Sequence, residues 1–238
     1  MKTVLITGGT RGVGRAVAER FAKEGYRVAF VYRRSEKEAE ELSRSLGAVA
    51  IRADLSDREQ TLSAAEKAEE ALGHIDVLVN NAAVSSFSLL QDLSPEEWDR
   101  TLAVNLTAPF LLSKALLPGM IRRGYGRIVN ISSMWGIVGA SCEVHYSAAK
   151  AGLIGMTKAL AKEVGPSGVT VNAVAPGVIA TDMNAALSEE ALAALKEETP
   201  LGRIGTPEEV ASAVFFLAGE QASFITGEIL NLSGGYIV

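Results

Sequence analysis

The chain has 238 residues, 48% of them hydrophobic and 21% charged, which predicts one large globular domain and excludes disordered and fibrous proteins. Its formal net charge of -5 gives no basic surface, so we expect no nucleic-acid partner. The one cysteine, Cys142, excludes an intramolecular disulfide and favours a reducing compartment. We identify neither a signal segment nor an apolar stretch of about 18 residues, and therefore expect a cytoplasmic protein with no membrane partner.

Short runs of β-branched and aliphatic residues alternate with longer segments of helical periodicity along the chain. The expected strands are mostly continuously apolar, as buried parallel strands are, and cover residues 4–6, 28–31, 49–51, 77–79, 127–131, 169–174 and 229–232. The expected helices cover residues 14–23, 36–46, 58–72, 96–123, 147–164 and 207–218. Two of these helices begin with a cap residue, a proline and two acids, at Ser94 and Thr206.

This alternation predicts an α/β fold, a single-domain Rossmann-type doubly wound parallel sheet of about seven strands with helices on both faces. The single domain spans residues 1–238. One segment departs from the alternation, a polar and alanine-rich insertion at residues 179–205. It follows the sixth expected strand, on the side of the sheet where such folds bind ligands, and we expect it to form a small substrate lobe.

A glycine-rich stretch, Thr7–Gly14, connects the first expected strand to the first expected helix. Its backbone N–H groups and the helix dipole would face an anion such as a phosphate. The glycines are spaced G-x-x-x-G-x-G, which differs from the common dinucleotide pattern G-x-G-x-x-G. On this stretch alone, a tight turn in which glycines only supply positive φ is the alternative.

Further motifs follow the glycine stretch in a fixed order. Asn80-Asn81-Ala82, then Ser133, then Tyr146-x-x-x-Lys150 complete a pattern that resembles the short-chain dehydrogenase/reductase family in its shorter form. The resemblance runs from Met1 to Gly235. It implies an oxidoreductase that acts on CH–OH or C=O groups, uses a nicotinamide cofactor and holds no metal.

The resemblance also implies which residues bind the cofactor. At one of them, Ala83, this chain departs from the family's usual N-N-A-G by one methyl group, which matters only if the backbone there needs positive φ or the cofactor approaches closely. The expected cofactor-binding residues are Gly8, Thr10, Arg11, Gly12, Val13, Gly14, Arg33, Asp54, Leu55, Asn81, Ala82, Ala83, Tyr146, Lys150, Pro176, Gly177, Ile179 and Thr181.

The end of the second strand bears on which cofactor is bound. NAD-dependent relatives usually have an acid there that accepts hydrogen bonds from the adenosine ribose. This chain instead reads Val31-Tyr32-Arg33-Arg34, with no acid until Glu36. Arg33 and Arg11 could pair with a 2′-phosphate, which favours NADPH/NADP+ over NADH, although both could also be ordinary surface arginines.

The expected catalytic residues are Ser133, Tyr146, Lys150 and Asn105. Tyr146 and Lys150 are four residues apart at the start of a helix and share one face, and Ser133 ends the fifth strand. In hydride transfer to a carbonyl, Ser133 would polarise the oxygen and Tyr146 would protonate it. An adjacent ammonium on Lys150 should lower the pKa of the phenol from about 10. The resemblance adds that Lys150 binds the nicotinamide ribose and that Asn105 holds a proton-relaying water, although Asn105 could equally serve only the scaffold.

Other stretches concern the substrate. Residues 201–205, 207–211, 225–228 and 234–235 make the chain most similar to 3-oxoacyl-[acyl-carrier-protein] reductases of fatty-acid biosynthesis, which convert 3-ketoacyl to 3-hydroxyacyl thioesters. The resemblance thus implies acyl carrier protein as a partner and a homotetramer built through two long helices and the C-terminal strand. Residues 139–144 instead resemble reductases that act on 5-aminopentanoyl-modified elongation factor P, in which Glu143 would pair with a substrate ammonium.

Three further interpretations stay open at this point. The substrate could be a small ketone or sugar, or the chain could be a non-catalytic NADP-binding sensor, although a sensor has no need of Ser133, Tyr146 and Lys150 together. His145, next to Tyr146, should point away from it, and Cys142 is expected to be an unreactive thiol.

Overall fold

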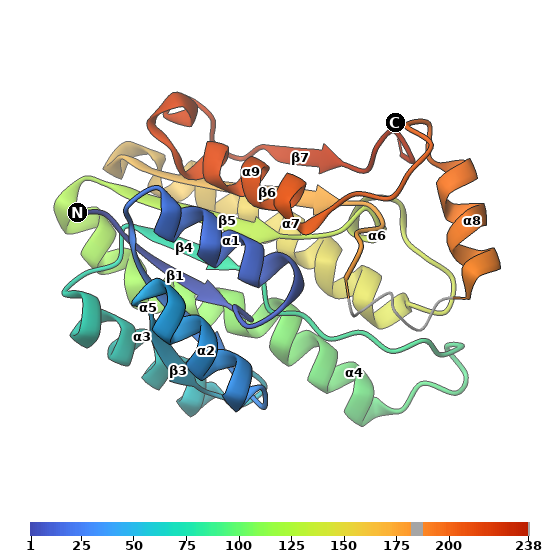
Figure 1. Ribbon diagram of the computed structural model, residues 1–238, viewed down its shortest axis with the longest axis horizontal. Coiled ribbons are helices and arrows are strands. Elements are labelled where there is room, and N and C mark those ends of the chain that lie inside the picture. The colour runs from blue at the N-terminus through green and yellow to red at the C-terminus, as the bar shows by residue number, and fades with distance from the viewer. Residues whose placement is uncertain (182–187, 238) are drawn as a thin grey trace.

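The computed structural model describes residues 1–181 and 188–237, and its strands form one parallel sheet in the order β3-β2-β1-β4-β5-β6-β7 (Figure 1). This confirms the predicted fold class. Every residue of β1, β4, β5 and β6 is buried, as continuously apolar parallel strands require. The strands are β1 (Thr3–Thr7), β2 (Arg27–Tyr32), β3 (Val49–Arg52), β4 (Val77–Asn80), β5 (Gly126–Ile131), β6 (Val169–Pro176) and β7 (Ile229–Leu232).

Helices cover both faces of this sheet (Figure 1). One face packs against α1 (Gly12–Lys23), α2 (Glu36–Leu46) and α9 (Pro207–Ala218). The other packs against α3 (Arg58–Leu72), α5 (Ala108–Arg123) and α7 (Val144–Val164). Two separate apolar cores result, one on each side of the sheet. The shorter elements are α4 (Pro95–Leu102), α6 (Trp135–Val138), α8 (Glu189–Glu198), η1 (Ala103–Thr107), η2 (Gly165–Ser167) and η4 (Glu220–Ala222).

Both predicted helix caps are present. The Ser94 hydroxyl accepts a hydrogen bond from the Glu97 backbone N–H at 3.1 Å at the start of α4. Thr206 and Glu209 form a reciprocal capping box at the start of α9. These caps mark where the two helices begin, because each hydroxyl accepts a hydrogen bond from a backbone N–H of the first helical turn.

The segment predicted as one helix over residues 96–123 differs from the expectation in two ways. It is divided by η1, a π-helical turn, into α4 and α5. Moreover, Pro95–Arg123 contains an 18-residue window with a mean hydropathy of 1.3, which is apolar enough for a membrane span, so the expectation of no such stretch is wrong by length and composition. Half of this window is buried inside the protein, where α5 packs against the sheet and α3. The segment is thus the core helix of a folded domain.

The first and last residues of the insertion at 179–205 lie side by side in the structure. Ile179 and Gly205 pair as an isolated parallel bridge, and Ala180 N donates to Gly205 O at 2.9 Å. Between them α8 lies beyond the carboxyl ends of the strands, at the right of Figure 1. Part of the predicted substrate lobe, residues 182–187, lies outside the described residues, and the role of the lobe stays a prediction.

Candidate active site

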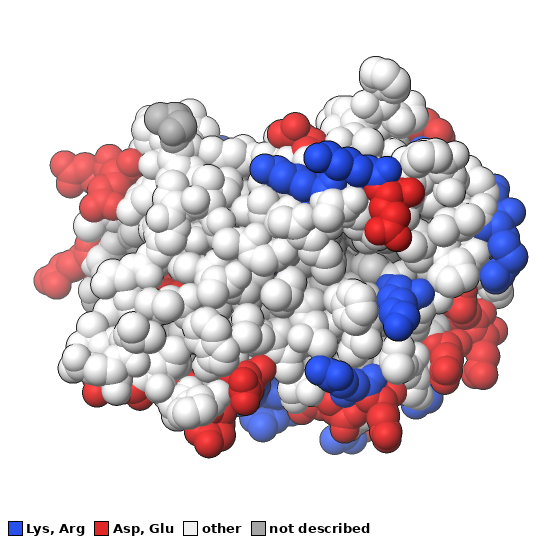
Figure 2. Space-filling view, turned by 180° about the vertical axis from the view of Figure 1, so that it is seen from behind, with Lys and Arg blue, Asp and Glu red and all other residues white. Residues whose placement is uncertain are grey.

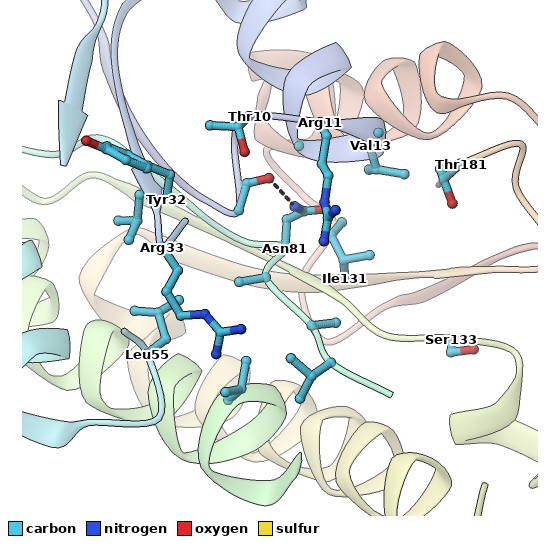
Figure 3. Close-up of a pocket in the computed structure, with 18 of the residues that line it drawn as sticks. Thr10, Arg11, Val13, Tyr32, Arg33, Leu55, Asn81, Ile131, Ser133 and Thr181 are labelled. Carbon is cyan, nitrogen blue, oxygen red and sulfur yellow. Dashed lines mark hydrogen bonds between the residues drawn. The ribbon is translucent and has the colours of Figure 1, made fainter. Parts of the chain in front are cut away.

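A cavity of about 490 Å³ opens at the carboxyl ends of the central strands (Figure 3). This is the place where doubly wound sheets bind ligands, because the strand order reverses there between β1 and β4. Every residue predicted to bind the cofactor lines this cavity, and Ser133 lines it as well. Residues far apart in the sequence, from Gly8 to Thr181, therefore meet in one elongated site.

The glycine turn builds one wall of this cavity. Gly8 has a φ of +68°, and a Cβ placed on Gly14 would lie 2.0 Å from the Gly8 carbonyl oxygen, so neither position accepts a side chain without a shift. Helix α1 starts directly after this turn, its N-cap residue Arg11 makes no side-chain cap hydrogen bond, and its first turn has no acid. The first N–H groups of α1 thus remain available to an anion, which fits the phosphates of a dinucleotide.

Asn81 and Thr7 hold this turn in place. The Asn81 side-chain amide donates to the carbonyl oxygens of Thr7 at 2.9 Å and Gly8 at 3.3 Å. In return, the Thr7 hydroxyl accepts from the backbone N–H groups of Asn81 and Ala82, both at 2.9 Å. Ala83 is not among the described residues with positive φ, so its extra methyl group imposes no backbone strain. Asn81 therefore shapes the cradle as well as lining it.

Two arginines occupy the end of the cavity beside β2. Figure 3 shows the guanidinium groups of Arg11 and Arg33 pointing into the cavity from opposite sides. Arg33 Nη1 lies 3.6 Å from the Asp54 carboxylate. Partial burial opposes ionisation of Asp54, but hydrogen bonds from Ser56 and the charge of Arg33 outweigh it and lower the pKa of Asp54. Asp54 thus holds Arg33 over the site as a charged partner.

Ser133, Tyr146 and Lys150 lie together in the same cavity. Ser133 Oγ accepts a hydrogen bond from the Trp135 backbone N–H at 3.1 Å, and Lys150 Nζ lies 5.6 Å from the Tyr146 ring centroid. Lys150 Nζ also donates to the Ile131 carbonyl oxygen at 2.6 Å. Ser132, by contrast, donates to the Lys150 carbonyl oxygen at 3.0 Å, so the two neighbouring serines serve different partners. A hydroxyl, a phenol and an amine are therefore assembled around one point.

The protonation of this trio differs from the expectation. Burial, supported by the charge of Glu143, raises the pKa of Tyr146 to about 12 despite the opposing effect of the Ser133 hydroxyl. Burial also lowers the pKa of Lys150 to about 7. The expectation that Lys150 lowers the pKa of Tyr146 is therefore wrong for the free protein, because burial affects both groups more strongly than their mutual attraction.

Asn105 lies beside the cavity without lining it. It is fully buried in η1, where its side-chain carbonyl accepts from Val84 N at 2.9 Å and its amide donates to Val84 O at 2.8 Å. Both of its polar groups thus hold the chain after β4. The predicted water-holding role of Asn105 stays a prediction.

Several lining residues were not predicted. Most of them adjoin a predicted residue at a strand end, so the rule that ligands bind beyond carboxyl ends would have indicated them. Val104 had no such signal, because it reaches the cavity from η1. The unpredicted residues are Val31, Tyr32, Arg34, Ser35, Ala53, Val84, Val104, Ile131 and Ser132. In the described part of the chain, no cluster of three His, Cys, Asp or Glu side chains could hold a metal ion.

The chain is similar over nearly its whole length to known reductases. A family model described as enoyl-(acyl carrier protein) reductase matches residues 8–237. A 3-oxoacyl-[acyl-carrier-protein] reductase of Aquifex aeolicus is 47% identical over 98% of this chain and 96% of its own length. Reductases of the same name are 43% identical in Escherichia coli, covering 98% of this chain and 96% of the relative, and 43% identical in Haemophilus influenzae, covering 98% and 97%. With this coverage and the site described above, the chain belongs to the short-chain dehydrogenase/reductase family and is an oxidoreductase.

Proposed function

We propose that the protein reduces 3-oxoacyl thioesters of acyl carrier protein to 3-hydroxyacyl thioesters in fatty-acid synthesis, with NADPH as the reductant. The observation that carries the proposal is that Ser133, Tyr146 and Lys150 line the same cavity as the glycine turn, with Lys150 Nζ 5.6 Å from the Tyr146 ring centroid. The names of the relatives, each more than 40% identical over nearly the whole chain, supply the substrate.

The nicotinamide would supply a hydride to the carbonyl carbon of the substrate. As negative charge develops on the carbonyl oxygen, the Ser133 hydroxyl donates a hydrogen bond to it, and the Tyr146 phenol donates its proton. The raised pKa of about 12 keeps Tyr146 protonated at neutral pH, ready to donate. The phenolate left behind favours the protonated form of Lys150, whose pKa of about 7 allows it to take up a proton in this range.

The preference for NADPH follows from the arginines at the other end of the cavity. Arg33 and Arg11 point into it, and the end of β2 contributes arginines to the lining and no acid. A 2′-phosphate dianion could pair with one or both guanidinium groups, whereas NADH has no group that needs them. Asp54, two residues after the end of β3, pairs with the Arg33 guanidinium at 3.6 Å.

The family model and the relatives name two different reactions, which one experiment separates. Purified protein is mixed with NADPH and either 3-oxobutanoyl or 2-butenoyl acyl carrier protein, and NADPH absorbance is followed. We expect turnover of the 3-oxo thioester alone, because Ser133 and Tyr146 together serve an oxygen that becomes a hydroxyl. Turnover of the enoyl thioester alone would contradict the proposal, and NADPH binding without any turnover would favour a sensor.

A second candidate substrate is a ketone that carries an ammonium group. Glu143 is half-buried close to Tyr146, its Oε1 accepts from Ser85 Oγ at 2.6 Å, and no Lys or Arg among the described residues is within ion-pair distance of it. Its charge opposes ionisation of Tyr146, and a cation bound there would relieve this effect. This candidate predicts faster reduction of a dimethylamino ketone than of its neutral analogue with CH in place of nitrogen. Equal rates would exclude it.

We also propose that the chain acts in the cytoplasm as a homotetramer. Large apolar side chains are at least two-fifths exposed on α5, on α9 and in the segment before β7, namely Phe110, Ile121, Phe216 and Phe224. Figure 2 views the face on which α5 and α7 lie and contains a wide area without charged side chains. Such apolar surface is typical of contacts between subunits.

A further inference from the structure

The segment after β4 and the start of α7 are joined by three hydrogen bonds. Ser85 Oγ donates to Glu143 Oε1 at 2.6 Å, Ser86 Oγ lies 3.0 Å from His145 Nε2, and Ser88 N donates to Cys142 O at 2.9 Å. We call these contacts between residues 85–88 and 142–145 the clasp. None of the six residues lines the cavity, but the clasp adjoins Val84 on one side and Tyr146 on the other, and both of those do.

The start of α7 lacks the support that some other helices of this protein have. Its N-cap residue, Glu143, makes no side-chain cap hydrogen bond; α3, α4, α8 and α9 have such a bond, whereas α1, α2, α5 and α6 do not. Tyr146 is the third residue of this helix, within the turn that an absent cap leaves free to fray. The position of the phenol therefore depends on contacts from the side, which the clasp supplies.

Two residues of the clasp, Cys142 and His145, are in arrangements that cost free energy of folding. Cys142 has a φ of +63°, and it is the one non-glycine residue with positive φ in the described chain. Such a conformation persists only where surrounding contacts impose it. His145 is fully buried, and its Nδ1 has no hydrogen-bond partner among the described residues. An apolar side chain would avoid that unsatisfied nitrogen, but it would lose the contact with Ser86.

The clasp also continues a chain of contacts across the site. Asn105 holds both backbone groups of Val84, the clasp joins the next residues to α7, and Tyr146 reaches back to Ser133. The wall that faces the substrate is thus fixed at both ends. From the sequence we predicted only that the His145 side chain points away from Tyr146. In the structure it contacts Ser86 in the clasp.

We propose that the clasp holds Tyr146 in position against Ser133, and that His145 and Glu143 are positioning residues for the reduction. The inference rests on the proposed carbonyl reduction at this site. On this proposal His145 affects the rate of the chemical step without touching substrate or cofactor. A displacement of about 1 Å at a reacting group lowers that rate on the order of 100-fold.

The test compares His145→Phe with His145→Gln, using 3-oxobutanoyl acyl carrier protein and NADPH. Phenylalanine fills the buried site without the hydrogen bond, whereas the glutamine amide reproduces the position of Nε2. We expect kcat to fall roughly 10-fold or more in His145→Phe, with the Kd for NADPH unchanged, and to stay within about threefold in His145→Gln. Ser86→Ala should match His145→Phe, and the double variant should be no slower than either, because both remove one contact.

Three controls keep the result interpretable. Ser141→Ala changes an exposed serine next to the clasp and should leave kcat unchanged. Glu143→Gln keeps a hydrogen-bond acceptor for Ser85 but removes the charge near Tyr146, so it should shift the Tyr146 limb of the pH–rate profile to lower pH, which a merely structural residue would not do. Ser86→Ala, at a half-buried position, keeps the proposal testable if His145→Phe does not fold.

An unchanged kcat in both His145→Phe and Ser86→Ala, with normal wild-type turnover, would overturn the clasp while leaving the proposed function intact. Equal losses in His145→Phe and His145→Gln would overturn it as well, because the hydrogen bond would then not be what matters. A wild-type protein that binds NADPH but turns over no carbonyl compound would overturn the proposed function and this inference together.

Discussion

Lys150 shows how one buried side chain combines a catalytic property with a cost in stability. It is 2% exposed, its one hydrogen-bond acceptor among the described residues is the Ile131 carbonyl oxygen, and burial lowers its pKa from 10.5 to about 7. Between these two values the unfolded chain binds a proton that the folded chain does not. The free energy of unfolding therefore increases as pH rises through this range. Below pH 7 the folded protein carries the full cost of burying a charged amine.

We predict that the difference in free energy of unfolding between the wild type and Lys150→Met depends on pH. Methionine fills the same space without a titratable group, so stability of the wild type relative to the variant should rise by about 1.4 kcal/mol per pH unit between pH 7 and pH 9. Urea unfolding of both proteins at the two pH values measures this. A constant difference would show that Lys150 is not neutral in the folded protein.

Arg33 is the residue whose replacement tests the cofactor preference. We predict that Arg33→Asp raises the KM for NADPH by about 10-fold or more and the KM for NADH far less, because an acid there repels a 2′-phosphate and pairs with a ribose hydroxyl. Initial rates at varied cofactor concentration give both values. Arg34→Asp, at the next position of the same lining, is the matched control. Equal increases for the two cofactors in Arg33→Asp would contradict the assignment.

At the scale of elements, the glycine turn and the π-helical turn η1 behave differently as sequence signals. The glycine spacing predicted a cradle between β1 and α1, because glycine adopts the positive φ of Gly8 without strain and leaves room for the close approach at Gly14. The division of residues 96–123 by η1 could not be predicted, since apolar periodicity continues through it. The roles of Ser85, Ser86 and His145 were equally hidden, because hydrogen bonds between distant loops leave no periodic pattern.

We predict that Gly14→Ala abolishes NADPH binding or unfolds the protein. The added methyl would lie 2.0 Å from the Gly8 carbonyl oxygen and 2.6 Å from the Asn81 amide, so the turn and α1 must separate. Gly155→Ala is the control, because α7 leaves open space at that position and alanine should stabilise the helix by about 0.5–1 kcal/mol. Cofactor titration and thermal unfolding distinguish the two. Normal NADPH affinity in Gly14→Ala would refute the close contact.

At the scale of the whole molecule, the parallel sheet and its two helical layers followed from the alternation of strands and helices, since right-handed crossovers place helices on both faces. The pKa values of Tyr146 and Lys150 could not be predicted from the sequence, because the burial that shifts them is a property of the assembled fold. Resemblance to relatives narrowed the range of candidate substrates. The cavity geometry alone is compatible with more than one carbonyl compound.

The apolar surface on α5 leads to a prediction about assembly. In sedimentation experiments we expect a species of about four times the 25.1 kDa chain mass. Phe110→Glu places a charge on an exposed apolar side chain of α5, so it should dissociate this species into smaller ones while cofactor binding persists. A wild-type protein that sediments as a monomer at micromolar concentration would exclude the tetramer.

The most direct test of the account is Tyr146→Phe, which removes one hydroxyl from the buried phenol and keeps its packing. With 3-oxobutanoyl acyl carrier protein we predict that kcat/KM falls by about 100-fold to 10,000-fold, because the phenol is the proposed proton donor, and that NADPH affinity stays unchanged. A variant that retains more than about a tenth of the wild-type kcat/KM would show that Tyr146 is not the proton donor.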